Sequence, residues 1–169
     1  MIEKTSEDSK SVIENNLRKT LLISVGNEYR SDDGIGLVIA RAIREKLLPS
    51  VIVKEESGEG AALMEAWQGF QNVIIVDAVS SGAMPGTIFR IDANTETVPI
   101  TFFHYSTHAF SVAEAVELAK VINTLPSRLL VYGIEGAVFT AGIKISSRVK
   151  EAANQVIEQI IGEIETANR

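Results

Sequence analysis

The chain has 169 residues, of which 46% are hydrophobic, enough to fill the core of one domain of ordinary size. Its formal net charge of -6 argues against a nucleic-acid partner, because proteins that bind phosphate backbones usually carry a basic face. Cysteine is absent, which excludes disulfides, thiolate metal ligation and a cysteine nucleophile.

The sequence also lacks the features of membrane and secreted proteins. No uninterrupted apolar run approaches the roughly 20 residues that cross a bilayer, and the N-terminus has no apolar segment of a secretory signal. We therefore expect a cytoplasmic monomer that binds neither membranes nor nucleic acid. Because the first residues are polar and weakly patterned, we predict an N-terminal arm over residues 1–18 and a single domain over residues 19–169.

Short segments rich in Val, Ile and aromatic residues alternate with longer segments of helical spacing. The predicted strands are residues 20–26, 51–57, 72–79, 86–93 and 128–135. The predicted helices are residues 34–47, 60–69, 110–123 and 146–165. This alternation predicts an α/β/α sandwich with a mostly parallel sheet of about five strands. It breaks over residues 80–109, so we expect an antiparallel or edge strand at 86–93.

The first predicted strand ends in a polar turn with three acidic residues and one cation: Glu28, Asp32, Asp33 and Arg30. The turn lacks the G-x-G-x-x-G and G-x-x-x-x-G-K-[ST] patterns of nucleotide-binding loops, and its charge would repel phosphate. It is suited instead to holding a cation or to acid–base chemistry. An aspartate at such a place often caps the following helix, and we expect this role for one of Asp32 and Asp33, with Asp32 as the candidate to test.

Other polar candidates follow the later strands, where functional groups of open α/β sheets gather. Asp77 ends an apolar run, and a buried carboxylate there needs either a cation or hydrogen-bond donors such as backbone amides. His104 and His108 lie just before the helix predicted from residue 110. Two carboxylates and an imidazole at one sheet edge indicate an O,O,N site for nickel, zinc or manganese.

The string SVGNEYRSDDGIG, followed by VDAV and STHAF, resembles the hydrogenase maturation endopeptidases. The hallmark of that family is Gly-Asn, four spacer residues, an aspartate, an acidic residue and a glycine, found here between Gly26 and Gly34. The resemblance covers about residues 20–165 and includes the string YGIEG. It implies an endopeptidase that removes a C-terminal peptide from a nickel-loaded hydrogenase large-subunit precursor.

In that family one residue from each motif binds the nickel of the precursor. By position these residues are Asp33, Asp77 and His108, which are also the implied catalytic residues. His108 is preferred to His104 because it directly precedes the helix, whose dipole keeps an imidazole neutral and able to bind metal. The family often has proline after the glutamate of the last motif, where this chain has Gly136. Glu135 is interpreted either as a residue that supports the metal ligands or as a loop anchor.

Two descriptions of the chemistry stay open. In the first, the metal polarises the scissile carbonyl and activates water. In the second, the metal is a recognition tag, and Asp33 or Asp77 acts as general base. A metal-sensing or chaperone-like module that binds a nickel-loaded partner without cutting it fits the same residues, as does a protease for a non-hydrogenase precursor.

Four aromatic residues near the predicted site are candidate substrate contacts: Tyr29, Phe102, Phe103 and Tyr105. Ordinary packing is the favoured role of Phe102 or Phe103.

Overall fold

The computed structural model describes residues 19–46, 48–103 and 110–167, so the predicted arm over residues 1–18 lies outside it. The strands of its single sheet are β1 (Thr20–Val25), β2 (Val51–Glu56), β3 (Asn72–Val79), β4 (Ile88–Asp92) and β5 (Arg128–Glu135). The helices are α2 (Ile35–Glu45), α3 (Gly60–Ala66), α4 (Val112–Val121) and α5 (Ser147–Ala167). Two short 3-10 segments are η1 (Ser31–Gly34) and η2 (Ile100–Phe103).

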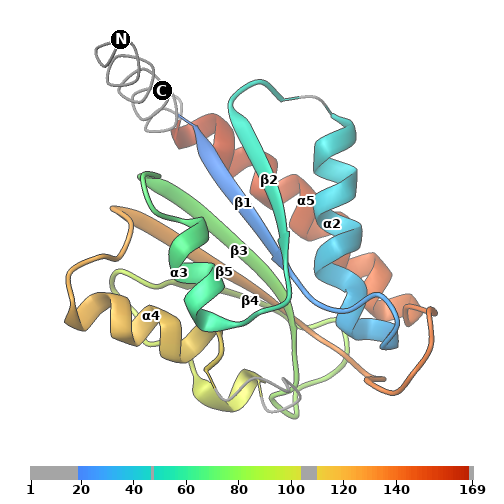
Figure 1. Cartoon of the computed structure of the whole chain (residues 1–169). Coiled ribbons are helices and arrows are strands. Elements are labelled where there is room, and N and C mark those ends of the chain that lie inside the picture. Colours follow the sequence, from blue (N-terminus) through green and yellow to red (C-terminus); the bar gives the residue numbers. More distant parts are fainter. Residues whose placement is uncertain (1–18, 47, 104–109, 168–169) are drawn as a thin grey trace, which may run out of the picture.

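Helices cover both faces of the sheet, with α2 and α5 on one face and α3 and α4 on the other (Figure 1). One apolar core surrounds Trp67 on the α3 and α4 face, and a second surrounds Tyr132 on the α2 and α5 face. Because β1, β3 and β5 are buried from both sides, they are nearly continuous apolar runs rather than alternating ones. The predicted three-layer α/β/α sandwich is confirmed.

The sheet order is β2-β1-β3-β5-β4. All neighbouring strands pair in parallel except β4, which lies at the edge and runs antiparallel to β5, so the prediction for residues 86–93 is confirmed. The parallel strands point the same way, and the loops that follow β1, β3 and β5 therefore leave at one edge of the sheet. Asp77 lies near this edge, paired in register with Gly133 of β5.

The helices that flank this edge begin where the sequence predicts. α2 begins two residues after Asp33, and α4 begins two residues after Phe110. The backbone N–H of Ser111 donates to the Glu114 carboxylate at 3.0 Å, as in a capping box, which fixes the first turn of α4. Within the described ranges, no helix has the length and apolar character that crossing a bilayer requires.

Candidate active site

The turn after β1 and the first turn of α2 each need glycine at one position, where the backbone approaches another segment closely. Gly26 has a φ of +146°, and a Cβ atom there would lie 2.0 Å from the Asp33 carbonyl oxygen. A Cβ atom on Gly36 would lie 2.4 Å from the Val25 carbonyl oxygen, so glycine lets α2 begin close over the end of β1. The Asn27 N–H donates to the Asp33 carbonyl at 3.3 Å and closes the turn.

Asp32 is a fully buried anion that ties this turn to residues 136–146, the loop after β5. Its carboxylate accepts hydrogen bonds from four donors: the N–H groups of Ala137 (2.8 Å), Val138 (3.0 Å) and Ser146 (2.7 Å), and the Ser146 hydroxyl (2.8 Å). Burial acts to raise the pKa of Asp32, but these hydrogen bonds outweigh it and hold the pKa below its ordinary value.

The prediction that Asp32 caps α2 is wrong. The N-cap position of α2 is Gly34, and no side chain caps the first turn of that helix. The donors that the Asp32 carboxylate binds lie 105 to 114 residues later in the chain. Asp32 is therefore a link between two distant loops rather than a local cap.

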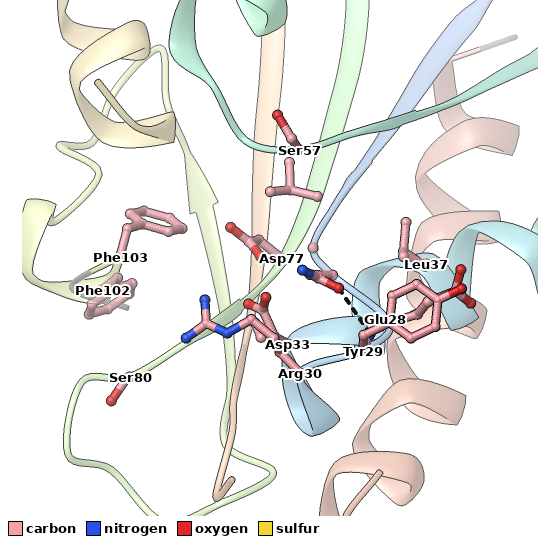
Figure 2. Close-up of a pocket in the computed structure, with 14 residues that line it drawn as sticks. Glu28, Tyr29, Arg30, Asp33, Leu37, Ser57, Asp77, Ser80, Phe102 and Phe103 are labelled. Atoms are coloured by element: carbon pink, nitrogen blue, oxygen red, sulfur yellow. Dashed lines mark hydrogen bonds between the residues drawn. The ribbon is translucent and has the colours of Figure 1, made fainter. Parts of the chain in front are cut away.

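A pocket of about 270 Å³ opens at the carboxyl edge of the sheet (Figure 2). Most of its lining comes from the turn after β1, from the ends of β1 and β3, and from η2, and Leu37 of α2 and Ser57 after β2 complete it. The polar side chains of the lining include Asp33, Asp77, Arg30 and Ser80. The structure thus brings together two of the residues that the sequence singles out, Asp33 from the first motif and Asp77 from the second.

When both are ionised, these two aspartates carry negative charges that repel each other. The pKa of Asp77, which is 6% exposed, lies well above its ordinary value because of burial and the nearby charge of Asp33. A hydrogen bond from the Ala78 N–H acts in the other direction. Burial likewise raises the pKa of Asp33, against the charge of Arg30 and a hydrogen bond from the Asn27 N–H. Paired carboxylates with raised pKa values in a cleft are typical of sites that bind cations or transfer protons.

Arg30 is a pocket residue that the sequence interpretation does not select. Figure 2 shows its guanidinium reaching into the pocket beside Asp33. A guanidinium stays charged and offers several N–H donors, so it can bind a carbonyl oxygen as well as moderate the charge of Asp33. Its only signal in the sequence is that it is the lone cation of an acidic turn.

Glu135, at the end of β5, holds the loop on the other side of the pocket. Its carboxylate is buried and accepts the N–H of Ser81 at 3.0 Å, the N–H of Gly82 at 3.1 Å and the Ser81 hydroxyl at 2.7 Å. The loop that follows β3, which contributes Ser80 to the pocket, is thereby fixed to β5. The interpretation of Glu135 as a loop anchor is confirmed.

The histidines of the predicted site, His108 and the alternative His104, lie outside the described residues. Among the residues that the structure does describe, no three His, Cys, Asp or Glu side chains gather closely enough to hold a metal ion. Asp33 and Asp77 supply two carboxylates, and the third ligand stays a prediction.

The candidate aromatic contacts divide by exposure. Tyr29 and Phe103 both line the pocket, but Tyr29 is 69% exposed, whereas Phe103 is only 7% exposed and belongs to the core. Phe102 lines the pocket and also packs against Phe89, with ring centroids 4.7 Å apart. Ordinary packing therefore describes Phe103 well, and Tyr105 lies outside the described residues.

Comparison with known proteins gives a consistent result. The HycI hydrogenase maturation protease profile matches residues 42–163, a range that includes Asp77 and begins after the turn that carries Asp33. A Methanocaldococcus jannaschii protein, provisionally named as a hydrogenase maturation protease, is 28% identical over 150 residues, which are 85% of this chain and 95% of that protein. The hydrogenase 2 maturation protease of Escherichia coli is 25% identical over 147 residues, covering 85% of this chain and 88% of that protein.

Solved structures share the fold. The hydrogenase maturating endopeptidase HybD from Escherichia coli superposes with a TM-score of 0.75 at 22% identity, covering 88% of this chain and 93% of that one. The solution structure of an endopeptidase from Escherichia coli gives a TM-score of 0.73 at 26% identity, covering 85% of this chain and 90% of that one. From the profile match over most of its length, we conclude that this chain belongs to the hydrogenase maturation protease family.

Proposed function

We propose that this chain is an endopeptidase that removes a C-terminal peptide from the nickel-loaded precursor of a hydrogenase large subunit. The observation that carries the proposal is the pair of carboxylates, Asp33 and Asp77, in one pocket at the sheet edge. A divalent cation between them would relieve both their repulsion and the cost of their burial. Family membership supports the class of reaction.

In this proposal the nickel ion arrives with the substrate. Asp33 and Asp77 bind it through carboxylate oxygens, and His108 adds an imidazole nitrogen. Oxygen and nitrogen ligands suit nickel, zinc and manganese about equally, so the selectivity for nickel comes from the precursor rather than from the pocket. Three protein ligands also leave coordination positions for groups of the precursor.

Hydrolysis requires a base for water and a proton donor for the leaving amine. Water adds to the scissile carbonyl carbon, the C–N bond breaks, and the proton taken from water passes to the leaving nitrogen. In our proposal a carboxylate oxygen of Asp77 that is not bound to nickel carries this proton, since Asp77 lies in the pocket and is buried from bulk water. The N–H groups of Arg30, in the same pocket, bind the carbonyl oxygen as negative charge develops on it.

The test is incubation of the full chain with a nickel-loaded large-subunit precursor, followed by mass spectrometry of the precursor. We expect the loss of a short C-terminal peptide, and we expect Asp33→Asn, Asp77→Asn and His108→Ala to abolish it. Asp92→Asn is the matched control, because Asp92 ends β4 and pairs with Leu130 near the amino end of β5, away from the pocket.

The same experiment separates the other functions that fit these residues. A chain that binds the nickel-loaded precursor and leaves it whole would be a metal-sensing or chaperone-like module. A chain that cuts only a non-hydrogenase precursor would have the proposed chemistry with a different substrate. Cutting that persists in Asp77→Asn at saturating nickel would assign the activation of water to the metal rather than to Asp77.

A further inference from the structure

Exposed apolar side chains gather on two adjoining loops beside the pocket. Tyr29, in the turn after β1, is 69% exposed, and Val138 and Ile143, in the loop after β5, are 42% and 78% exposed. Single exposed apolar residues are common on monomeric proteins, but a group of them beside a functional cleft marks a surface that binds another protein.

Hydrogen bonds join the two loops into one unit. The Gly142 N–H donates to the Tyr29 carbonyl at 2.9 Å, and the Asp32 N–H donates to the Val138 carbonyl at 3.0 Å. The four hydrogen bonds to the Asp32 carboxylate add to these links. In Figure 1 the orange loop of residues 136–146 runs beside the beginning of α2. Because the loops are already tied together, a partner that binds their apolar side chains orders little additional chain.

The pocket alone is too small for the contact that a protein substrate requires. Its volume of about 270 Å³ is below the usual range for drug-sized ligands and accommodates only a short stretch of peptide. A specific protein complex buries roughly 800 Å² on each partner, so most of the contact with a precursor must lie outside the pocket. Tyr29 both lines the pocket and belongs to the exposed group, so the apolar surface continues directly from the pocket rim.

We propose that Tyr29, Val138 and Ile143 form a docking surface for an apolar patch on the folded body of the precursor, whose C-terminal segment enters the pocket. The identity of the partner rests on the proposed function. The inference adds the loop of residues 136–146 to the recognition of the substrate, although this loop contributes no residue to the pocket lining. Recognition and chemistry are thus assigned to neighbouring but separate sets of side chains.

The test compares Ile143→Ser with Val121→Ser, because both side chains are 78% exposed. Val121 ends α4, which leads back to the start of β5 at the opposite end of the sheet, so it is a matched control. Binding of the nickel-loaded precursor is measured by calorimetry. We expect Ile143→Ser to weaken binding about tenfold, and Val138→Ser combined with Ile143→Ser to weaken it further. Val121→Ser should stay within about twofold of the parent, with all melting temperatures nearly unchanged.

Cleavage kinetics give a second readout, in which the loop variants should raise KM and leave kcat unchanged. If the parent cuts the precursor and the loop variants bind it like the parent, the docking surface is refuted and the proposed function stands. If the parent binds without cutting and Ile143→Ser weakens binding, the docking surface stands and the protease activity is refuted. A parent that does not bind the precursor refutes the docking surface. The docking surface is also refuted if Ile143→Ser abolishes self-association of the chain but leaves precursor binding unchanged, because the surface would then be an interface between copies of this chain.

Discussion

Replacing Asp32 by alanine removes the link between the turn after β1 and the loop after β5. The carboxylate accepts four hydrogen bonds of 2.7 to 3.0 Å, and the side chain is fully buried. Hydrogen bonds to a charged group contribute about 1.5–3 kcal/mol each, but they are not additive, and the loop can relax so that water reaches the freed donors. We therefore expect Asp32→Ala to lower the free energy of unfolding by about 3–4 kcal/mol.

This expected loss of stability distinguishes a link between two loops from a helix cap, since losing a cap costs only about 1 kcal/mol. Asp33→Ala is the control, because burial disfavours the charged form of the Asp33 carboxylate. We expect that control to leave stability unchanged or to raise it. Asp32→Asn keeps one acceptor oxygen but turns an amide donor toward N–H groups. We therefore expect it to lower the free energy of unfolding by less than Asp32→Ala does.

The assay is urea unfolding followed by the fluorescence of Trp67, the only tryptophan of the chain and a buried core residue. Amide exchange gives an independent readout, because the N–H groups of Ala137, Val138 and Ser146 should lose protection in Asp32→Ala. A loss of only about 1 kcal/mol with these amides still protected would refute the reasoning.

The sign of the pH dependence follows from the pKa of Asp32. Because its folded pKa is depressed, Asp32 contributes stability that is present above the ordinary value of 3.8 and is lost as pH falls through the folded pKa. The gap in stability between the parent and Asp32→Ala should therefore be full at neutral pH and should shrink under strong acid.

The pocket and its rim give three further expectations. Asp77→Asn should raise the free energy of unfolding at neutral pH, because the folded pKa of Asp77 is raised and its charged form is disfavoured. Urea unfolding at several pH values should show this gain disappearing as the pH falls to the ordinary carboxyl pKa of 3.8. Nickel affinity, measured by calorimetry, should fall below about pH 6.5 and should be lost in Asp33→Ala and Asp77→Ala, since metal binding requires deprotonated carboxylates and a neutral His108. Tyr29→Ala should weaken precursor binding with little change in melting temperature, whereas Phe103→Ala, at a core position, should cost about 3–5 kcal/mol.

The fold was predictable because its signals are local. Each central strand is a short apolar run that helices bury on both faces of the sheet. The helices have their own periodicity, and a capping box marks the start of α4. The positions of Asp33 and Asp77 also follow from local signals, because the carboxyl ends of parallel strands share one sheet edge. Even the antiparallel edge strand could be anticipated, because it lies within the stretch where the alternation breaks.

The roles of Asp32 and Arg30 could not be predicted in the same way. A carboxylate beside the start of a helix reads as a cap, and nothing near Asp32 in the sequence points to partners that lie more than a hundred residues away. Arg30 likewise becomes a pocket residue only once the turn is closed, because the direction of its side chain depends on the backbone from Gly26 to Asp33. Long-range hydrogen bonds decide the role of Asp32, and the closed backbone of the turn decides that of Arg30; periodicity decides neither.

The adjacent aspartates of the turn show how the same side chain acquires opposite properties. Backbone N–H groups surround Asp32 and stabilise its charge, whereas burial disfavours the charge of Asp33, which lines the same pocket as Asp77. A repelling pair tends to separate unless the backbone that carries it is fixed. Asp32 fixes that backbone from the loop after β5, and Glu135 fixes the loop that leaves the strand of Asp77. Two buried, well-bonded carboxylates therefore hold two poorly stabilised ones at the same sheet edge. We expect a cation in the pocket to bind more tightly for this reason, because the two carboxylates proposed as its ligands cannot move apart.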